Sequence, residues 1–188
     1  MERLWQKTPL IRSSAMSAKT GCEVYLKIET FQTSGSFKGR GVSHFANNAT
    51  KGYLESRGLL DTDTYVNGNS NSNSLLDTKE LASRISSTDW NEWSIPCKTS
   101  HIPANKRPHL IIASGGNAGL SAASAARILG VNASIFLPAA QEGIKHLFLR
   151  HNTGIDGDAR IEVNIGGENY FAALKAAEKF SDELGDRG

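Results

Sequence analysis

The chain has 188 residues, of which 39% are hydrophobic and 21% charged, and its formal net charge is +2. This length suits one globular domain, and a surplus of two charges is too small to indicate a nucleic acid or an anionic membrane as partner. Because no long apolar run or apolar leader segment occurs, we expect a cytoplasmic protein without membrane contact. Cys22 and Cys97 lie far apart without a metal-ligand pattern, so we expect free thiols and no metal site.

The N-terminal part is predicted to run through a short helix, a strand and a long helix. Ser13 can cap the short helix, which Gly21 then ends. Residues 23–29 alternate polar and apolar side chains with a period of two, which is typical of a half-buried strand. A polar loop follows and can cap a helix over residues 37–53. Lys38 is therefore expected in the first turn of that helix.

Residues 61–108 differ in composition from the rest of the chain. Their centre, residues 67–74, is a run of asparagine, serine and glycine that cannot bury enough apolar surface to offset the entropy of ordering. A helix-like stretch over residues 75–85 falls inside the segment. We expect a disordered surface insertion that interrupts one folded body made of residues 1–60 and 109–188.

After the insertion, strand and helix patterns alternate. The predicted elements are a buried strand (109–113), a glycine-rich loop (114–119), a helix (120–129), a second strand (132–137), a helix-like stretch (142–150), a third strand (160–165) and a last helix (169–184). A strand, loop, helix and strand in this order predict a parallel pair of strands. The architecture is therefore expected to be α/β.

Lys38 is the first candidate for chemistry, because it lies where a glycine-rich loop meets a helix. The positive end of the helix dipole, together with nearby Phe37 and Arg40, favours an uncharged amine at this position. An uncharged lysine amine is what Schiff-base formation requires. Taken alone, however, one lysine in a glycine-rich loop is far more often a solvated surface residue than a reactive one.

The second candidate is the loop over residues 114–119, between a buried strand and the start of a helix. Successive backbone N–H groups, freed of side chains at Gly115 and Gly116, can hold a carboxylate or a phosphate. One alternative is a tight turn whose glycines serve only steric needs. Another is the phosphate loop of a dinucleotide-binding fold. That fold expects an acidic residue at the end of the next strand, whereas this strand ends in Phe136-Leu137-Pro138.

Four segments of the chain together resemble a known family. They are Thr8-Pro9-Leu10, Leu26-Lys27-Ile28-Glu29, Gln32-Thr33-Ser34-Gly35-Ser36-Phe37-Lys38-Gly39-Arg40-Gly41 and Ala113-Ser114-Gly115-Gly116-Asn117-Ala118-Gly119. In this order they look like the N-terminal half of the pyridoxal-phosphate-dependent serine/threonine dehydratases, which have fold type II and belong to the tryptophan synthase β-like superfamily. The Ser-Gly-Gly-Asn-Ala-Gly form is most similar to the fungal-type L-serine dehydratases. The resemblance covers residues 8–54 and 109–180 and implies a three-layer α/β fold with a parallel sheet.

The resemblance also implies roles for individual residues. Lys38 would bind pyridoxal 5′-phosphate through a Schiff base, Phe37 would lie against the pyridine ring, and Asn117 would hydrogen-bond the 3′ oxygen of the cofactor. The substrate carboxylate would lie against Ser114, Gly115, Gly116, Asn117 and Ala118. The implied reaction is the elimination of water from L-serine, and also from L-threonine, which yields pyruvate or 2-oxobutanoate and ammonia. The implied assembly of the full-length form is a homodimer.

The chain also departs from the family pattern. Family members are longer, and their C-terminal half carries the glycine-rich loop that binds the cofactor phosphate, whereas Gly166-Gly167 is the only later glycine pair here. We therefore expect a truncated dehydratase. One alternative is a non-catalytic binding or regulatory module. Another is a β-replacement enzyme such as a cysteine synthase, although those enzymes usually have Asn-Pro-x-x-Ser-x-Lys-Asp-Arg at the lysine and Ser-Gly-Asn-Thr-Gly at the loop.

Overall fold

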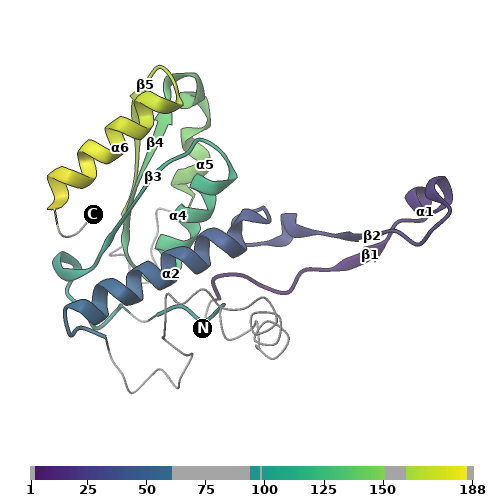
Figure 1. The fold of residues 1–188 in the computed structure, drawn as a ribbon, viewed down its shortest axis with the longest axis horizontal. Helices are drawn as coiled ribbons and strands as arrows, with labels where there is room; N and C mark the ends of the chain where they lie inside the picture. Colours follow the sequence, from purple (N-terminus) through teal and green to yellow (C-terminus); the bar gives the residue numbers. More distant parts are fainter. Residues whose placement is uncertain (1–2, 61–93, 98, 151–159, 186–188) are drawn as a thin grey trace, which may run out of the picture.

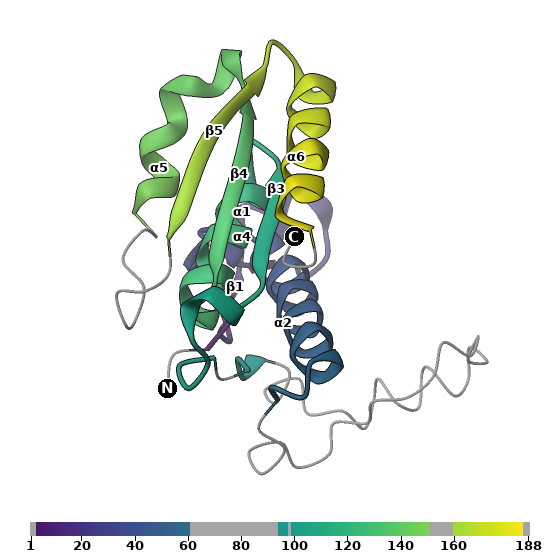
Figure 2. The ribbon, with the colours of Figure 1, turned by 90° about the vertical axis from the view of Figure 1, so that its left-hand side faces the viewer.

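A computed structural model describes residues 3–60, 94–97, 99–150 and 160–185. Its centre is a three-stranded parallel sheet in the order β3-β4-β5, formed by β3 (His109–Ala113), β4 (Asn132–Pro138) and β5 (Ile161–Gly167) (Figure 2). The pairing of β3 with β4 confirms the parallel pair predicted from the sequence.

Helices cover both faces of this sheet. Helix α6 (Tyr170–Leu184) packs on one face, and α4 (Asn117–Leu129) and α5 (Lys145–Leu149) lie on the other (Figures 1 and 2). Short 3₁₀ helices connect several elements, namely η1 (Glu29–Phe31), η4 (Ala104–Lys106) and η5 (Ala139–Ile144). None of the helices in the described part of the chain is both long and apolar enough to cross a membrane. The three-layer α/β fold expected from the sequence is confirmed.

The alternation of side chains along β3 explains why the sheet can pack on both sides. Leu110 and Ile112 contact the hydrophobic cluster on the α4 side, whereas Ile111 and Ala113 contact the cluster on the α6 side. The central strand β4 is buried on both faces, which accounts for its nearly continuous apolar sequence.

Helix α2 (Lys38–Ser56) packs against α4. Its buried side is made mostly of small and polar residues, namely Gly39, Ser43, Ala46, Asn47 and Thr50, and ends with the apolar Leu54. The spacing of these residues places them on one helical face. The many alanines of α4 on the other side of the contact leave room for a close approach of the two helices.

The N-terminal arm consists of β1 (Leu10–Arg12), α1 (Ser14–Thr20) and β2 (Tyr25–Lys27), and it projects away from the sheet (Figure 1). Ser13 caps α1 and Gly21, at φ 70°, ends it, as predicted. The prediction of a half-buried strand was wrong in its burial, because every residue of β1 and β2 is exposed. The two strands form an antiparallel ribbon on which no second layer packs among the described residues.

Most of the expected insertion, including the helix-like stretch over residues 75–85, lies outside the described residues. Its described part, residues 94–97 and 99–108, contacts the body of the protein and so differs from the expectation of disorder. The contacts include hydrogen bonds from the Leu4 N–H to the Ser94 carbonyl and from the Cys97 N–H to Asn47 Oδ1, both 2.8 Å long.

Candidate active site

Lys38 is the first residue of α2, and its side chain is exposed. The tight turn before it is closed by Gly35, at φ 74°, whose N–H donates to the Gln32 carbonyl at 2.7 Å. Lys38 Nζ lies 5.4 Å from the centre of the Phe37 ring, and Phe37 is itself 61% exposed. Apart from this contact with Phe37, the Lys38 amine makes no hydrogen bond or ion pair within the described part of the chain.

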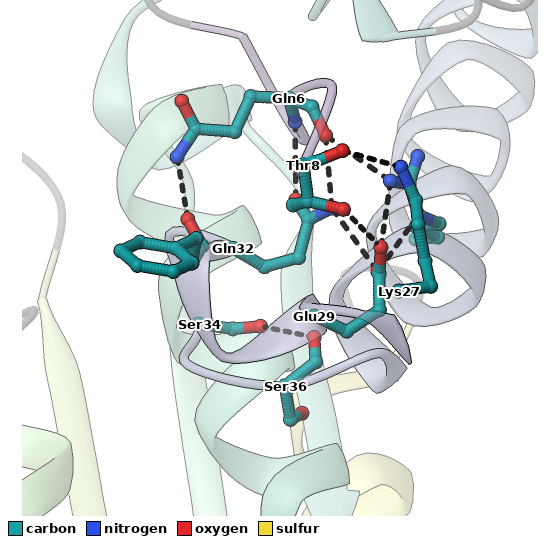
Figure 3. A network of polar contacts seen from close by, with 9 residues as sticks. Gln6, Thr8, Lys27, Glu29, Gln32, Ser34 and Ser36 are labelled. Atoms are coloured by element: carbon teal, nitrogen blue, oxygen red, sulfur yellow. Dashed lines mark hydrogen bonds and ion pairs between the residues drawn. The ribbon is translucent and has the colours of Figure 1, made fainter. Parts of the chain in front are cut away.

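The loop before α2 packs closely against the first turn of the helix. Ser34 and Ser36 are buried, and Ser34 Oγ donates to the Ser36 carbonyl at 3.4 Å (Figure 3). A Cβ atom on Gly39 would lie 2.6 Å from Ser34 Oγ. The loop and the first turn of α2 therefore meet without room for a side chain at position 39.

Glu29 anchors the first turn of α2 through a polar network that sequence reasoning missed. Its carboxylate accepts hydrogen bonds from Arg40 Nε (2.8 Å), Arg40 Nη2 (2.9 Å), Thr8 Oγ1 (2.5 Å) and Gln32 Nε2 (3.1 Å) (Figure 3). The Arg40 guanidinium, helped by the other donors, lowers the pKa of Glu29 to about 2. Glu29 lies in one of the segments that carry the resemblance, but nothing in that segment indicates its partner.

The predicted substrate loop lies at the start of α4. Ser114 Oγ accepts hydrogen bonds from the N–H groups of Gly116 (3.4 Å) and Gly119 (3.2 Å). A Cβ atom on Gly119 would overlap the Ser114 carbonyl oxygen and lie 2.9 Å from the Phe148 ring. Gly119 is thus required sterically, and Ser114 holds the loop in shape.

Several amides of this loop are available to a ligand. The N–H groups of Gly115, Asn117 and Ala118 have no hydrogen-bond partner among the described residues, and neither has the exposed side chain of Asn117. Helix N-termini leave such groups unsatisfied, and they favour an anion there. The geometry of the loop is therefore suited to a carboxylate.

Gln141 is a further residue of this site that the sequence did not reveal. It lies in η5, and its carboxamide occupies the space where a Cβ atom on Gly115 would be. Gln141 Oε1 is buried without a hydrogen-bond partner in the structure. Only its position shortly after β4 brings Gln141 to the loop, and no motif marks it.

The two predicted sets of residues lie on neighbouring helices. Lys38 begins α2 and Asn117 begins α4, and these two helices pack against each other (Figure 1). No hydrogen bond joins Lys38 to the loop in the described residues. The structure thus brings the two helices together and leaves both the amine and the amides unengaged.

These residues fit two parts of a pyridoxal-phosphate site. The unpaired Lys38 amine suits an aldehyde, the exposed Phe37 ring suits the pyridine, and the free amides suit a carboxylate. The Gly166-Gly167 pair does not supply the phosphate loop, because Cβ atoms there would press on Ala172 and Ala173 of α6. The close packing of β5 on α6 explains why glycines occupy positions 166 and 167.

Comparisons with known proteins also point to pyridoxal-phosphate-dependent enzymes. Residues 1–73 match the family described as "Pyridoxal-phosphate dependent enzyme". The chain is 33% identical over 131 residues to a human serine dehydratase-like protein, and the match covers 70% of the chain and 24% of the human protein. It is 28% identical over 134 residues to a truncated L-serine dehydratase of Saccharomyces cerevisiae, covering 71% of the chain and 68% of the yeast protein.

The fold also matches solved structures. A fungal L-serine ammonia-lyase from Rhizomucor miehei superposes with a TM-score of 0.52 at 22% identity, over 95% of this chain and 38% of that protein. The chain thus spans only a quarter to about a third of the length of the first curated relatives that it matches. Residues 1–73 are thus similar to pyridoxal-phosphate-dependent enzymes, the chain is similar in sequence to serine dehydratases, and it shares its fold with part of the fungal L-serine ammonia-lyase.

Proposed function

We propose that this chain carries the Schiff-base lysine and the substrate loop of a pyridoxal-phosphate-dependent L-serine dehydratase that also accepts L-threonine. The observation that carries the proposal is the unpaired Lys38 amine on a helix that packs against the helix bearing the amide-lined loop. The products are pyruvate or 2-oxobutanoate and ammonia. A cytosolic location and a homodimeric full-length form complete the proposal.

The loop binds the carboxylate of the amino acid. The N–H groups of Gly115, Asn117 and Ala118 donate to it, and the helix N-terminus adds a favourable field. Ser114 adds a further donor for a geometric reason. Its oxygen already accepts two N–H groups, so both lone pairs are used and the hydroxyl proton is left for the carboxylate.

Lys38 supplies the base. Pyridoxal phosphate, when bound, supplies the electron sink that makes the α-proton acidic and allows the β-hydroxyl to leave. Nζ of Lys38, as a free amine, would accept the α-proton of the substrate. Phe37 would offer its exposed apolar ring to the pyridine, and the exposed Asn117 side chain would hold the 3′ oxygen.

Trapping the cofactor on the chain tests this proposal. The 188-residue chain is incubated with pyridoxal phosphate, reduced with borohydride and digested, and the modified lysine is identified by mass spectrometry. We expect the modification on Lys38 and its loss in Lys38→Ala. Lys175→Ala, which removes an exposed lysine from α6, is the matched control and should leave the labelling of Lys38 unchanged. Equal labelling of many surface lysines would contradict the assignment.

A second candidate function, a non-catalytic binding module, is favoured by one observation. The projecting arm exposes large apolar side chains, namely Leu10 (63%), Ile11 (51%) and Tyr25 (50%). Leu10 and Tyr25 lie on one face of the ribbon and Ile11 on the other, so both faces offer apolar side chains to another polypeptide. Formation of pyruvate from L-serine by the purified chain would exclude this candidate, whereas cofactor bound at Lys38 without turnover would support it.

A further inference from the structure

A basic cavity lies beside the N-terminal segment and does not include Lys38. Its volume is about 550 Å³, and its lining includes Trp5, Lys7, Lys27 and Arg40. This volume lies within the range of small-ligand sites. The cavity therefore has the size of a binding site that the proposed dehydratase reaction does not use.

The charges around this cavity are unbalanced. Arg3, Lys7, Lys27 and Arg40 carry four positive charges, and no carboxylate is among the lining residues that the structure describes. Glu29, which forms an ion pair with Arg40, contributes one negative charge. Four positive charges against one negative charge leave a net excess of three, which favours an anion with more than one charge.

Three of the four cations, Lys7, Lys27 and Arg40, retain hydrogen-bond donors for a ligand. Lys27 Nζ uses one of its three N–H groups on the Thr8 carbonyl, at 2.6 Å. Arg40 uses Nε and Nη2 on Glu29 and leaves Nη1 without a partner among the described residues. The exposed Lys7 side chain makes no hydrogen bond in that part of the chain.

Lys27 and Arg40 are held in place before any ligand binds. Glu29 fixes Arg40 with two hydrogen bonds and also accepts one from Thr8 Oγ1. The carbonyl of Thr8 in turn fixes Lys27, so one network positions both cations (Figure 3). Preorganised donors lose less conformational entropy on binding than mobile ones do.

We propose that this cavity binds a small phosphate-bearing anion, either inorganic phosphate or the phosphate group of a small ester. A phosphate group carries close to two negative charges at neutral pH and has several acceptor oxygens. It therefore offsets more of the charge excess than a monocarboxylate would, and its oxygens can accept hydrogen bonds from donors on three separate segments. A monocarboxylate would leave two positive charges without a counterpart.

Calorimetric titration of the 188-residue chain with inorganic phosphate, at an ionic strength kept constant with sodium chloride, tests this site. We expect Lys27→Gln to weaken phosphate binding at least about tenfold, since a hydrogen bond to a charged group is lost. Lys175→Gln removes the same charge from the exposed face of α6 and should leave the affinity unchanged. Lys38→Ala should also leave it unchanged, because Lys38 does not line the cavity.

Circular dichroism of each variant shows whether it is folded, and Lys27→Arg, which keeps the charge, should retain binding if Lys27→Gln unfolds. Tighter binding of glycerol 3-phosphate than of inorganic phosphate would identify an ester as the ligand. Absence of phosphate binding, equal weakening by Lys175→Gln, or loss of binding in Lys38→Ala would each overturn the proposal. Phosphate binding is measured without any contribution from Lys38. A failure of this proposal is therefore distinguishable from a failure of the proposed dehydratase reaction.

Discussion

Arg40 and Glu29 form a two-pronged ion pair, in which Arg40 Nε lies 2.8 Å from Glu29 Oε2 and Arg40 Nη2 lies 2.9 Å from Glu29 Oε1. Arg40 belongs to the first turn of α2 and Glu29 to η1, so the pair ties these two elements together. Lys38 lies two residues before Arg40. The pair therefore also fixes the turn from which the reactive amine extends.

Glu29→Gln is expected to destabilise the protein in a pH-dependent way. The pKa of Glu29 falls from 4.5 to about 2 on folding, so its contribution is fully present above about pH 4.5 and is lost as the pH falls towards about 2. Since the Arg40 side chain is 37% exposed, solvent screening reduces the effect, and we expect a loss of about 1–2 kcal/mol at neutral pH.

Urea unfolding of the wild-type chain and of Glu29→Gln at neutral pH and at about pH 3 measures this difference. The gap between the two proteins should narrow at the lower pH. Glu162→Gln, at an exposed position on β5, is the matched control and should change stability little at either pH. A gap that stays constant between the two pH values would show that the ion pair is not the cause.

The two cysteines are expected to differ in reactivity. Cys22 is exposed, whereas Cys97 is buried, and burial raises the pKa of the Cys97 thiol to about 12. Because the thiolate is the reactive form, a thiol reagent should modify Cys22 in the native chain and reach Cys97 only after unfolding. Mass spectrometry of tryptic peptides checks this, with Cys22→Ser as control. Modification of both thiols at similar rates in the native state would contradict the described packing of residues 94–97.

Gly119→Ala is expected to destabilise the loop over residues 114–119. The added Cβ atom would overlap the Ser114 carbonyl and approach the Phe148 ring, and such overpacking costs about 1–3 kcal/mol. Gly116→Ala is the matched control, since a Cβ atom there meets nothing within 4 Å and φ is −115°. Denaturant unfolding should show a clear loss for position 119 and about 0.5 kcal/mol or less for position 116. Equal losses would mean that the loop is not packed as described.

Much of the fold could be predicted because local patterns determine it. The strand over residues 109–113 and the glycine stop after residue 129 follow from apolar runs and helix-ending signals, and β3 and α4 have these limits. The burial of residues 23–29 could not be predicted in the same way. Alternation shows that one side of a strand is apolar, but only the tertiary structure shows whether anything covers that side.

The same distinction between local patterns and tertiary contacts applies to the candidate site. Lys38 and the loop over residues 114–119 stand in short motifs, so the sequence suffices to find them, and their chemical roles stay predictions. Gln141 and the Glu29–Arg40 pair depend on contacts between segments separated by 26 and 11 residues. Neither has a motif of its own, and so folding alone brings these partners together.

Gly115→Ala tests the contact that sequence reasoning missed. The new Cβ atom would take the place of the Gln141 carboxamide, so Gln141 must move away from the loop. Its Oε1 is buried without a hydrogen bond and therefore has none to lose on moving. We expect Gly115→Ala alone to destabilise the chain by about 1–2 kcal/mol through overpacking.

The double variant Gly115→Ala/Gln141→Ala then separates crowding from backbone effects. If the clash with the carboxamide is the cause, shortening Gln141 should recover most of the loss, which gives a coupling energy of about 1 kcal/mol between the two positions. Gln141→Ala alone completes the double-mutant cycle, and urea unfolding measures the stability of all four proteins. Additive effects would place the cause in the Gly115 backbone, and Gln141 would then have no part in shaping the substrate loop.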